Sequence, residues 1–350
     1  MDLPTVWFVL VALLLAAYVV LDGFDLGAGL VHFAVARDDR ERRQVLRSIG
    51  PVWDGNEVFL LAAGGAIFCA FPALYARAFS GFYLPLMLVL WLLALRGLSI
   101  ELRGKIENAV WRPFWDAVFS GSSGLLALVF GVALGNVLRG VPADEEGRFF
   151  LPLWGDLFLG PEPGAIDAYT LLVGILCAAT LAWHGASWLS LKTDGPVSER
   201  ARRLARRLVG VVAVLAAGTI AATVGIRPWL WTSFLAFPPG ALFPLSAVLG
   251  IVLALLSVRG GRDGRAFLGS TLFVAGMLGC AAFDVFPYVL PSRPYPERSL
   301  SAAAAAASEH GLAVALAWFL PGMVLAAGYT VFVYRRFKGR VPLSEDDGGY

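Results

Sequence analysis

Long apolar runs constrain this chain more than any other feature of its sequence. A run of about 20 apolar residues can cross the hydrocarbon core of a bilayer as a helix, and a helix satisfies its own backbone hydrogen bonds in lipid. Because 58% of the residues are hydrophobic and only 15% are charged, the chain is far more apolar than a soluble protein. We predict an all-α integral membrane protein with about nine spanning helices, at 5–32, 51–74, 79–102, 114–138, 166–190, 204–225, 238–258, 265–288 and 311–334.

Lys and Arg residues gather in alternate connections between these runs. Of the 28 in the chain, 21 lie in the odd-numbered connections and the C-terminal tail, and six lie in the even-numbered connections. The remaining one, Arg96, lies inside the third run. Because basic connections stay on the cytoplasmic side, the N-terminus is predicted outside and the C-terminus in the cytoplasm. The regular alternation also supports an odd number of helices.

The connections are short, and no independent soluble domain fits between the runs. We therefore expect one polytopic membrane domain over residues 1–350. Its helix count allows a division into halves at 1–138 and 166–288, with an extra helix at 311–334. This division predicts two four-helix bundles plus one peripheral helix. No clear sequence repeat accompanies it.

Charged residues inside the runs mark the candidate functional site. Asp22 and Asp25 lie in the first run, Asp54 and Glu57 open the second, and Arg96 lies in the third. Each acid costs about 2.5–3.5 kcal/mol on membrane-insertion scales, so it calls for a reason. At about 1.5 Å per residue, all five lie roughly 6–12 Å to the cytoplasmic side of their helix centres. The sequence thus predicts one polar cluster shared by three consecutive helices.

Two interpretations of this cluster remain open. In one, Arg96 neutralises one or two of the acids and fixes helix packing. In the other, four acids outnumber one arginine, and the surplus carboxylates form a proton entry path. Further polar or aromatic residues border the same level: Trp53, Asn56, Ser99 and Glu101. The first turns of a helix also favour negative charge, which offsets part of the cost of Asp54 and Glu57 without any function.

Residues that could hold a cofactor are sparse. The three histidines never occur four apart, and the three cysteines show no CxxC spacing, so no metal site, c-type haem or disulfide framework is predicted. His184 is expected to be a hydrogen-bonded structural histidine rather than a haem or metal ligand. Asp284 is expected to cap or to pair. His32, at a helix end, is expected to snorkel toward the surface. No nucleotide-binding or nucleophile motif is present, and no nucleic-acid partner is expected.

Several motifs resemble subunit II of the cytochrome bd-type quinol oxidases. The densest are Asp-Gly-Phe-Asp-Leu-Gly-Ala-Gly at 22–29 and Gly-Pro-Val-Trp-Asp-Gly-Asn-Glu at 50–57. Similar segments follow along the whole chain, at 95–97, 103–108, 111–116, 135–142, 286–291 and 334–340. One departure is Glu57, because the family has Gln in some members and Glu in others.

The resemblance implies a complex of the bacterial inner membrane that oxidises quinol and reduces dioxygen to water. Two b-type haems and one d-type haem would belong to a separate subunit I, and this chain would not be catalytic alone. It would stabilise the complex and carry protons from the cytoplasm, with charge separation across the membrane. By position, Asp25, Asp54 and Lys105 fall on that route. The remaining expected route residues are Asp22 and Glu57, with Trp53, Asn56, Arg96 and Glu101 as polar support.

Further partners follow from the same resemblance. Some family members hold a structural quinone in this subunit, and some complexes contain a small single-helix accessory subunit. Membrane quinol and lipid are the other expected contacts. A different class of function, a stand-alone proton- or ion-coupled transporter, is the alternative, although no broken-helix pair or repeat is visible in the sequence.

Overall fold

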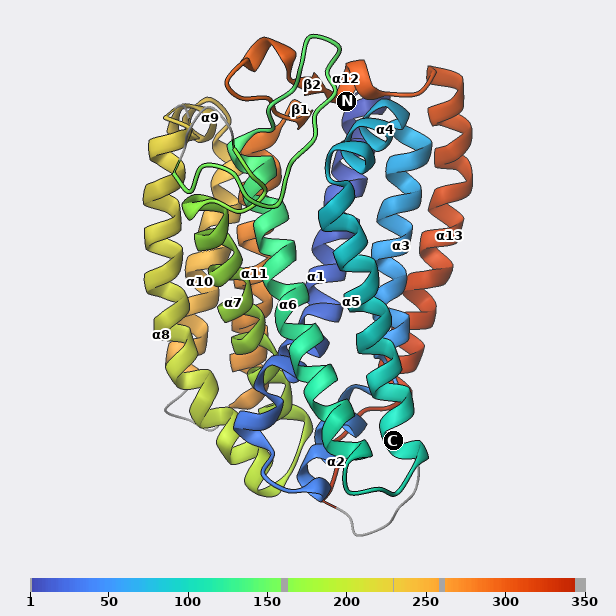
Figure 1. Cartoon of the computed structure of the whole chain (residues 1–350), viewed down its shortest axis with the longest axis vertical. Helices are drawn as coiled ribbons and strands as arrows, with labels where there is room; N and C mark the ends of the chain where they lie inside the picture. Colours follow the sequence, from blue (N-terminus) through green and yellow to red (C-terminus); the bar gives the residue numbers. More distant parts are fainter. Residues whose placement is uncertain (1, 159–162, 229, 258–261, 344–350) are drawn as a thin grey trace.

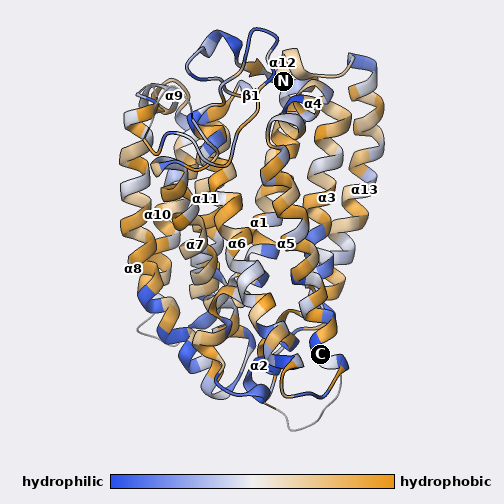
Figure 2. Cartoon of the chain, viewed as in Figure 1, coloured by the Kyte–Doolittle hydropathy of each residue, from blue (hydrophilic) through white to orange (hydrophobic). Residues whose placement is uncertain are grey.

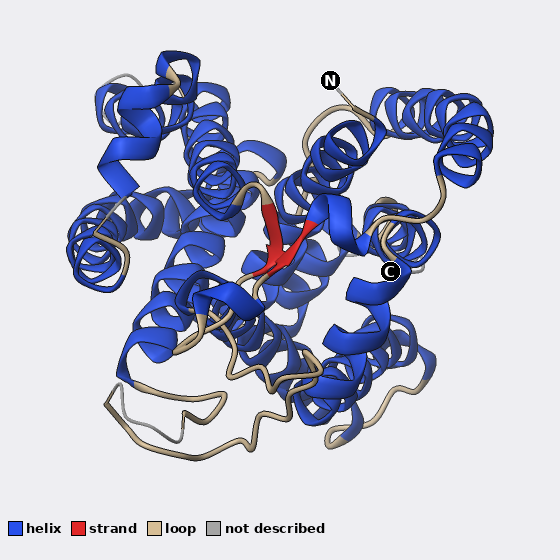
Figure 3. Ribbon diagram, turned by 90° about the horizontal axis from the view of Figure 1, so that it is seen from above, coloured by secondary structure: helices blue, strands red, loops and turns tan. Residues whose placement is uncertain are grey.

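The computed structural model describes residues 2–158, 163–228, 230–257 and 262–343, and this part of the chain is almost entirely helical (Figure 1). Two short strands, β1 (Tyr288–Leu290) and β2 (Leu300–Ser301), pair antiparallel (Figure 3) at the end of the molecule where α1 begins (Figure 1). The helices are α1 (Leu3–Val35), α2 (Asp39–Ile49), α3 (Trp53–Ala70), α4 (Pro72–Gly81), α5 (Tyr83–Leu102), α6 (Trp111–Arg139), α7 (Ala168–Lys192), α8 (Gly195–Ile226), α9 (Leu230–Ala236), α10 (Leu242–Ser257), α11 (Asp263–Val285), α12 (Ala302–Ala305) and α13 (Glu309–Arg336).

Nearly every apolar run predicted to cross the membrane is a long helix in the structure. Among the described residues, eight helices are long and apolar enough to cross a membrane, and α3 with α4 makes a ninth span if the bent pair is counted as one. The expectation of an all-α integral membrane protein is confirmed. Figure 2 shows an apolar middle between two polar ends.

The second predicted run, 51–74, differs from the expectation of one straight helix. Helix α3 ends at Ala70, and α4 leaves it at an angle of 119°. Pro72 explains the break, because proline has no N–H to donate and its ring would clash with a carbonyl in the preceding turn of a continuing helix. Proline is well suited to the first turn of a new helix, where it stands in α4.

Helix α1 lies at the centre of the molecule and packs against α3, α6, α7 and α11. Its closest approach is to α7, where Gly27 and Gly185 meet. A Cβ atom built on Gly27 would lie 1.9 Å from the carbonyl oxygen of Leu181, so only glycine permits this crossing. Helix α13 lies at one edge, against α3 and α1 (Figure 1), as expected of a peripheral helix. The division into halves stays a prediction.

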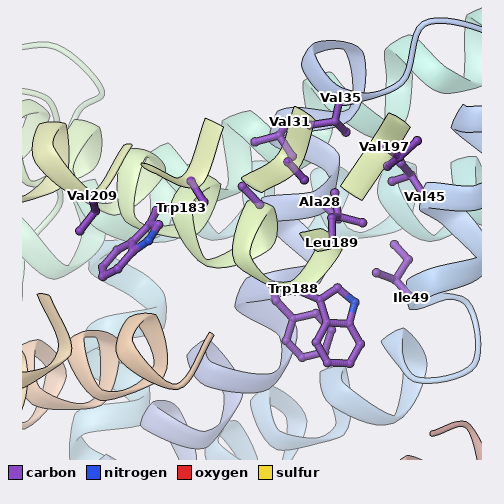
Figure 4. Packing of buried hydrophobic residues seen from close by; sticks show 14 of the residues in the cluster. Ala28, Val31, Val35, Val45, Ile49, Trp183, Trp188, Leu189, Val197 and Val209 are labelled. Atoms are coloured by element: carbon purple, nitrogen blue, oxygen red, sulfur yellow. The ribbon is translucent and has the colours of Figure 1, made fainter. Parts of the chain in front are cut away.

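A large apolar cluster joins α1 and α2 to α7 and α8 (Figure 4). Trp188 of α7 stacks on Phe24 of α1 with ring centroids 4.1 Å apart, while Leu189 and Ile49 are fully buried beside them. Phe24 lies between the two acids of α1. The packing therefore fixes the orientation of the helix turn that carries Asp22 and Asp25.

Candidate functional site

Arg96 of α5 is the centre of a buried ion-pair network. Its guanidinium binds Asp22 of α1 through both terminal nitrogens, with Nη1 2.8 Å from Oδ2 and Nη2 2.7 Å from Oδ1. Nη2 also lies 2.7 Å from Oε1 of Glu57 in α3. The side chains of Arg96 and Asp22 are fully buried, whereas 23% of the Glu57 side chain is exposed. One arginine thus ties three helices together, and Glu57 connects it to the protein surface.

The second acid of α1, Asp25, belongs to a neighbouring network. Asn56 of α3 donates from Nδ2 to Oδ2 of Asp25 at 2.7 Å and to the backbone carbonyl of Leu21 at 3.2 Å. Tyr334 of α13 donates its hydroxyl to Oδ1 of Asn56 at 2.9 Å. The other carboxylate oxygen, Oδ1 of Asp25, is buried without a hydrogen-bond partner among the described residues. Asn56 therefore links the outermost helix to a buried carboxylate.

Aromatic and hydroxyl groups complete the cluster. The guanidinium carbon of Arg96 lies 6.0 Å from the centroid of the Trp53 ring, within reach of a cation–π contact. Ser99 is buried and donates to the backbone carbonyl of Arg96 at 2.6 Å. Both are residues that the sequence placed beside the acids.

Three further predicted residues are exposed or half-buried. Asp54 and Lys105 are exposed, and Glu101 is half-buried at the end of α5. Glu57 faces Arg96 from α3, while Asp54, one turn earlier, faces outward. The structure thus brings together Asp22, Asp25 and Glu57 with Arg96 and Asn56. The packing interpretation and the proton-path interpretation both fit this geometry.

A second charged cluster, which sequence reasoning did not assemble, surrounds Asp116 of α6. Arg103 donates from Nε to Oδ1 of Asp116 at 2.6 Å, and Nε2 of His32 lies 3.0 Å from the same oxygen. Arg42 approaches Oδ2 at 3.4 Å. The expectation that His32 snorkels is wrong, because its side chain is fully buried. The sequence signal for this cluster was Asp116 itself, an acid near the start of the run 114–138 and on the same predicted side as the basic connections.

His184 and Asp284 have structural partners. His184 is fully buried, with Nδ1 2.7 Å from the hydroxyl of Ser270 and Nε2 3.0 Å from the carbonyl oxygen of Val20. Both ring nitrogens are engaged, so this residue does not fit a haem iron. Asp284 forms an ion pair with Arg227, 2.8 Å from Nε to Oδ2. Within the described residues, no three His, Cys, Asp or Glu side chains are grouped to hold a metal ion.

Comparison with known proteins identifies the family. The family model for cytochrome bd terminal oxidase subunit II matches residues 3–337. The chain belongs to this family. Cytochrome bd-I ubiquinol oxidase subunit 2 of Escherichia coli K12 is 35% identical, covering 96% of this chain and 94% of that protein. Cytochrome bd ubiquinol oxidase subunit 2 of Bacillus subtilis is 31% identical, with 98% of each covered.

The fold comparison agrees with the sequence comparison. The structure of bd oxidase from Geobacillus thermodenitrificans matches with a TM-score of 0.75 over 96% of this chain and 99% of that chain, at 20% identity. A probable cytochrome oxidase subunit 2 of Haemophilus influenzae is 36% identical, covering 96% of this chain and 94% of that protein. The chain is therefore a subunit of a respiratory terminal oxidase, an oxidoreductase. Its family implies haems in the complex, a partner subunit I and the bacterial inner membrane, and it decides against a stand-alone transporter.

Proposed function

We propose that this subunit supports quinol oxidation and the four-electron reduction of O2 to water in subunit I, by stabilising the complex and supplying protons from the cytoplasm. One observation carries the proposal. Arg96 holds Asp22 and Glu57 in a buried network that is partly exposed at Glu57, on the side that the basic connections predict to be cytoplasmic. Carboxylates that are rigidly held and still reachable from the surface suit a proton path better than carboxylates that are sealed from it.

The proposed route begins at surface groups and ends at buried ones. Asp54 is exposed one turn before Glu57 on α3, Glu101 is half-buried near the end of α5, and Lys105 is exposed just after that helix. Glu57 accepts protons from these groups, and Asp22 and Asp25 receive them in the interior. Arg96 cannot release its own proton, so its role is to hold the carboxylates in place and to balance part of their charge. Because the three carboxylates outnumber the one guanidinium, the cluster can take up a proton without burying additional net charge.

The chemistry of oxygen belongs to the haems. We place the two b-type haems and the one d-type haem in subunit I, because His184 of this chain uses both ring nitrogens in hydrogen bonds. Haem supplies electron transfer and oxygen reduction, and protons taken up from one side only would produce charge separation. A structural quinone, a small accessory subunit, membrane quinol and lipid are further proposed contacts.

The test compares carboxylates of the proposed route with a carboxylate outside it. We expect Asp25→Asn, Glu57→Gln and Asp54→Asn to slow quinol-driven oxygen uptake and the accompanying proton uptake from the cytoplasmic side of vesicles. Asp284→Asn is the matched control, because it removes another buried, arginine-paired carboxylate far from the cluster. The control should keep wild-type proton uptake per oxygen reduced.

Two other outcomes would contradict the proton role. Wild-type turnover and intact haem spectra in all three route variants would leave helix packing as the explanation. Loss of haem from the route variants, with normal turnover per remaining haem, would show that these carboxylates only stabilise the complex.

A further inference from the structure

A basic cavity of about 350 Å³ lies at the end of the molecule that carries α2 and the last turn of α13. No acidic side chain lines it among the residues that the structure describes. The charged residues on its walls are all cations: Arg47, Lys192, Arg336, Lys338 and Arg340. Its volume is within the range of small-molecule sites.

Three of these cations have no acidic partner in the part of the chain that the structure describes. Lys192 donates from Nζ to the backbone carbonyl of Phe337 rather than to a carboxylate. Arg336 and Lys338 are exposed at the end of α13 and beyond it, and neither forms an ion pair with a described residue. Arg340 differs, because it is held by Asp194 at 3.0 Å and by Asp263 at 3.2 Å. Uncompensated positive charge therefore concentrates on one cavity.

The walls of the cavity are fixed by hydrogen bonds that cross between distant segments. The backbone N–H of Val341 donates to the carbonyl of Lys192 at 2.7 Å. Gln44 of α2 donates from Nε2 to the carbonyl of Val341, also at 2.7 Å. These bonds lay the segment after α13 across the ends of α7 and α2. Trp188 also lines the cavity, and the centroid of its ring lies 5.7 Å from Nζ of Lys192.

We propose that this cavity binds a phosphate group, carried either by the headgroup of an anionic lipid or by a soluble phosphate compound. Three cations without acidic partners call for an anion of more than one charge or with several acceptor oxygens, which a phosphate provides. The cavity also lies where the spanning helices end, at the level of a bilayer surface, and basic pockets between helices at this level suit phospholipid headgroups. The chain's own acidic residues Glu345, Asp346 and Asp347 are the competing occupant.

The experiment uses the chain purified with whatever subunits accompany it, stripped of lipid in detergent. Native mass spectrometry then follows binding of phosphatidylglycerol, of phosphatidylcholine and, separately, of inorganic phosphate. The double variant Arg336→Gln/Lys338→Gln removes two lining charges. The control Arg203→Gln/Arg335→Gln removes two exposed charges from the same end, outside the cavity.

We expect the lining variant to bind the anionic probe about tenfold more weakly or worse, while the control binds as the wild type does. Preference for phosphatidylglycerol over inorganic phosphate identifies a lipid headgroup, and the reverse identifies a soluble phosphate compound. Equal binding by the lining and control variants overturns the proposal. So does binding that appears only after residues 344–350 are deleted, because the acidic tail would then be the occupant.

Discussion

Single side chains hold the buried cluster together, and Arg96 makes contacts to two of its acids. Its guanidinium satisfies both oxygens of Asp22 and one oxygen of Glu57. Removing one partner of a buried pair leaves an uncompensated charge, and this costs more than the pair contributes when it is intact.

Arg96→Gln is therefore expected to destabilise the folded subunit by about 3–5 kcal/mol, the usual cost of breaking a buried ion pair. Thermal unfolding of the purified complex measures the effect. Arg96→Lys keeps the charge but loses the two-pronged contact, so its melting temperature should fall between wild type and Arg96→Gln. Equal melting temperatures for all three proteins would show that the network does not stabilise the fold.

Glu41, in the short helix α2 outside the spans, gives a prediction for pH. Burial raises the pKa of its carboxyl, but the ion pair with Arg200 and the backbone N–H of Arg37 outweigh burial and hold this pKa below its ordinary value of 4.5. A lowered folded-state pKa means that the stabilisation is complete above the unfolded value and is lost as pH falls through the folded value.

Glu41→Gln should accordingly lower the melting temperature at pH 7, and the difference from wild type should shrink once the pH drops below 4.5. Melting curves of both proteins across this range provide the measurement. A difference that persists unchanged to the lowest pH would mean that the charge of Glu41 is not what stabilises α2.

The sequence predicts which residues belong to the cluster better than it predicts which side chains touch. Spacing along helices and the side of the membrane sufficed to group Asp22, Glu57 and Arg96. They could not show that Asp54 faces outward, because helix rotation depends on packing against neighbours. They also could not show that Asp116 of α6 meets His32 of α1, because these two residues are 84 positions apart in sequence.

At the scale of helices, close crossings depend on glycine. Gly27 and Gly185 let α1 and α7 approach until backbone meets backbone, which is how small residues stabilise helix pairs in lipid. Hydropathy cannot reveal such pairs, because glycine contributes little to it. The same limitation explains the bend at Phe71, where apolar character continues across a proline that ends the helix.

Gly185→Ala is expected to reduce stability by about 1–3 kcal/mol, the usual cost of overpacking, because its Cβ would lie 2.1 Å from the carbonyl carbon of Gly27. Gly218→Ala on α8 is the matched control, since no atom lies within 4 Å of a Cβ built there. The yield and melting temperature of the assembled complex measure both variants. A control that suffers as much as Gly185→Ala would refute the role of the crossing.

At the scale of the whole molecule, the placement of charge predicts orientation. The apolar runs were sufficient to predict the spans because each helix must match the bilayer thickness on its own. Which end faces the cytoplasm depends instead on basic connections. The structure places α2 and the last turn of α13 at one end and the first turn of α1 at the other (Figure 1), so one labelled position at each end suffices to test the predicted orientation.

Cysteines introduced at Glu107 and Glu145 provide that test. The Glu107 side chain, on the α2 end, is 74% exposed, and the Glu145 side chain, in the loop that follows α6, is 85% exposed. In a background with Cys69, Cys177 and Cys280 replaced by Ala, an impermeant maleimide should label Glu145→Cys in intact cells. Glu107→Cys should react only after the membrane is permeabilised. The reverse labelling pattern would mean that the subunit has the opposite orientation in the membrane. Glu57 would then lie on the outer side, where it could not take up protons from the cytoplasm.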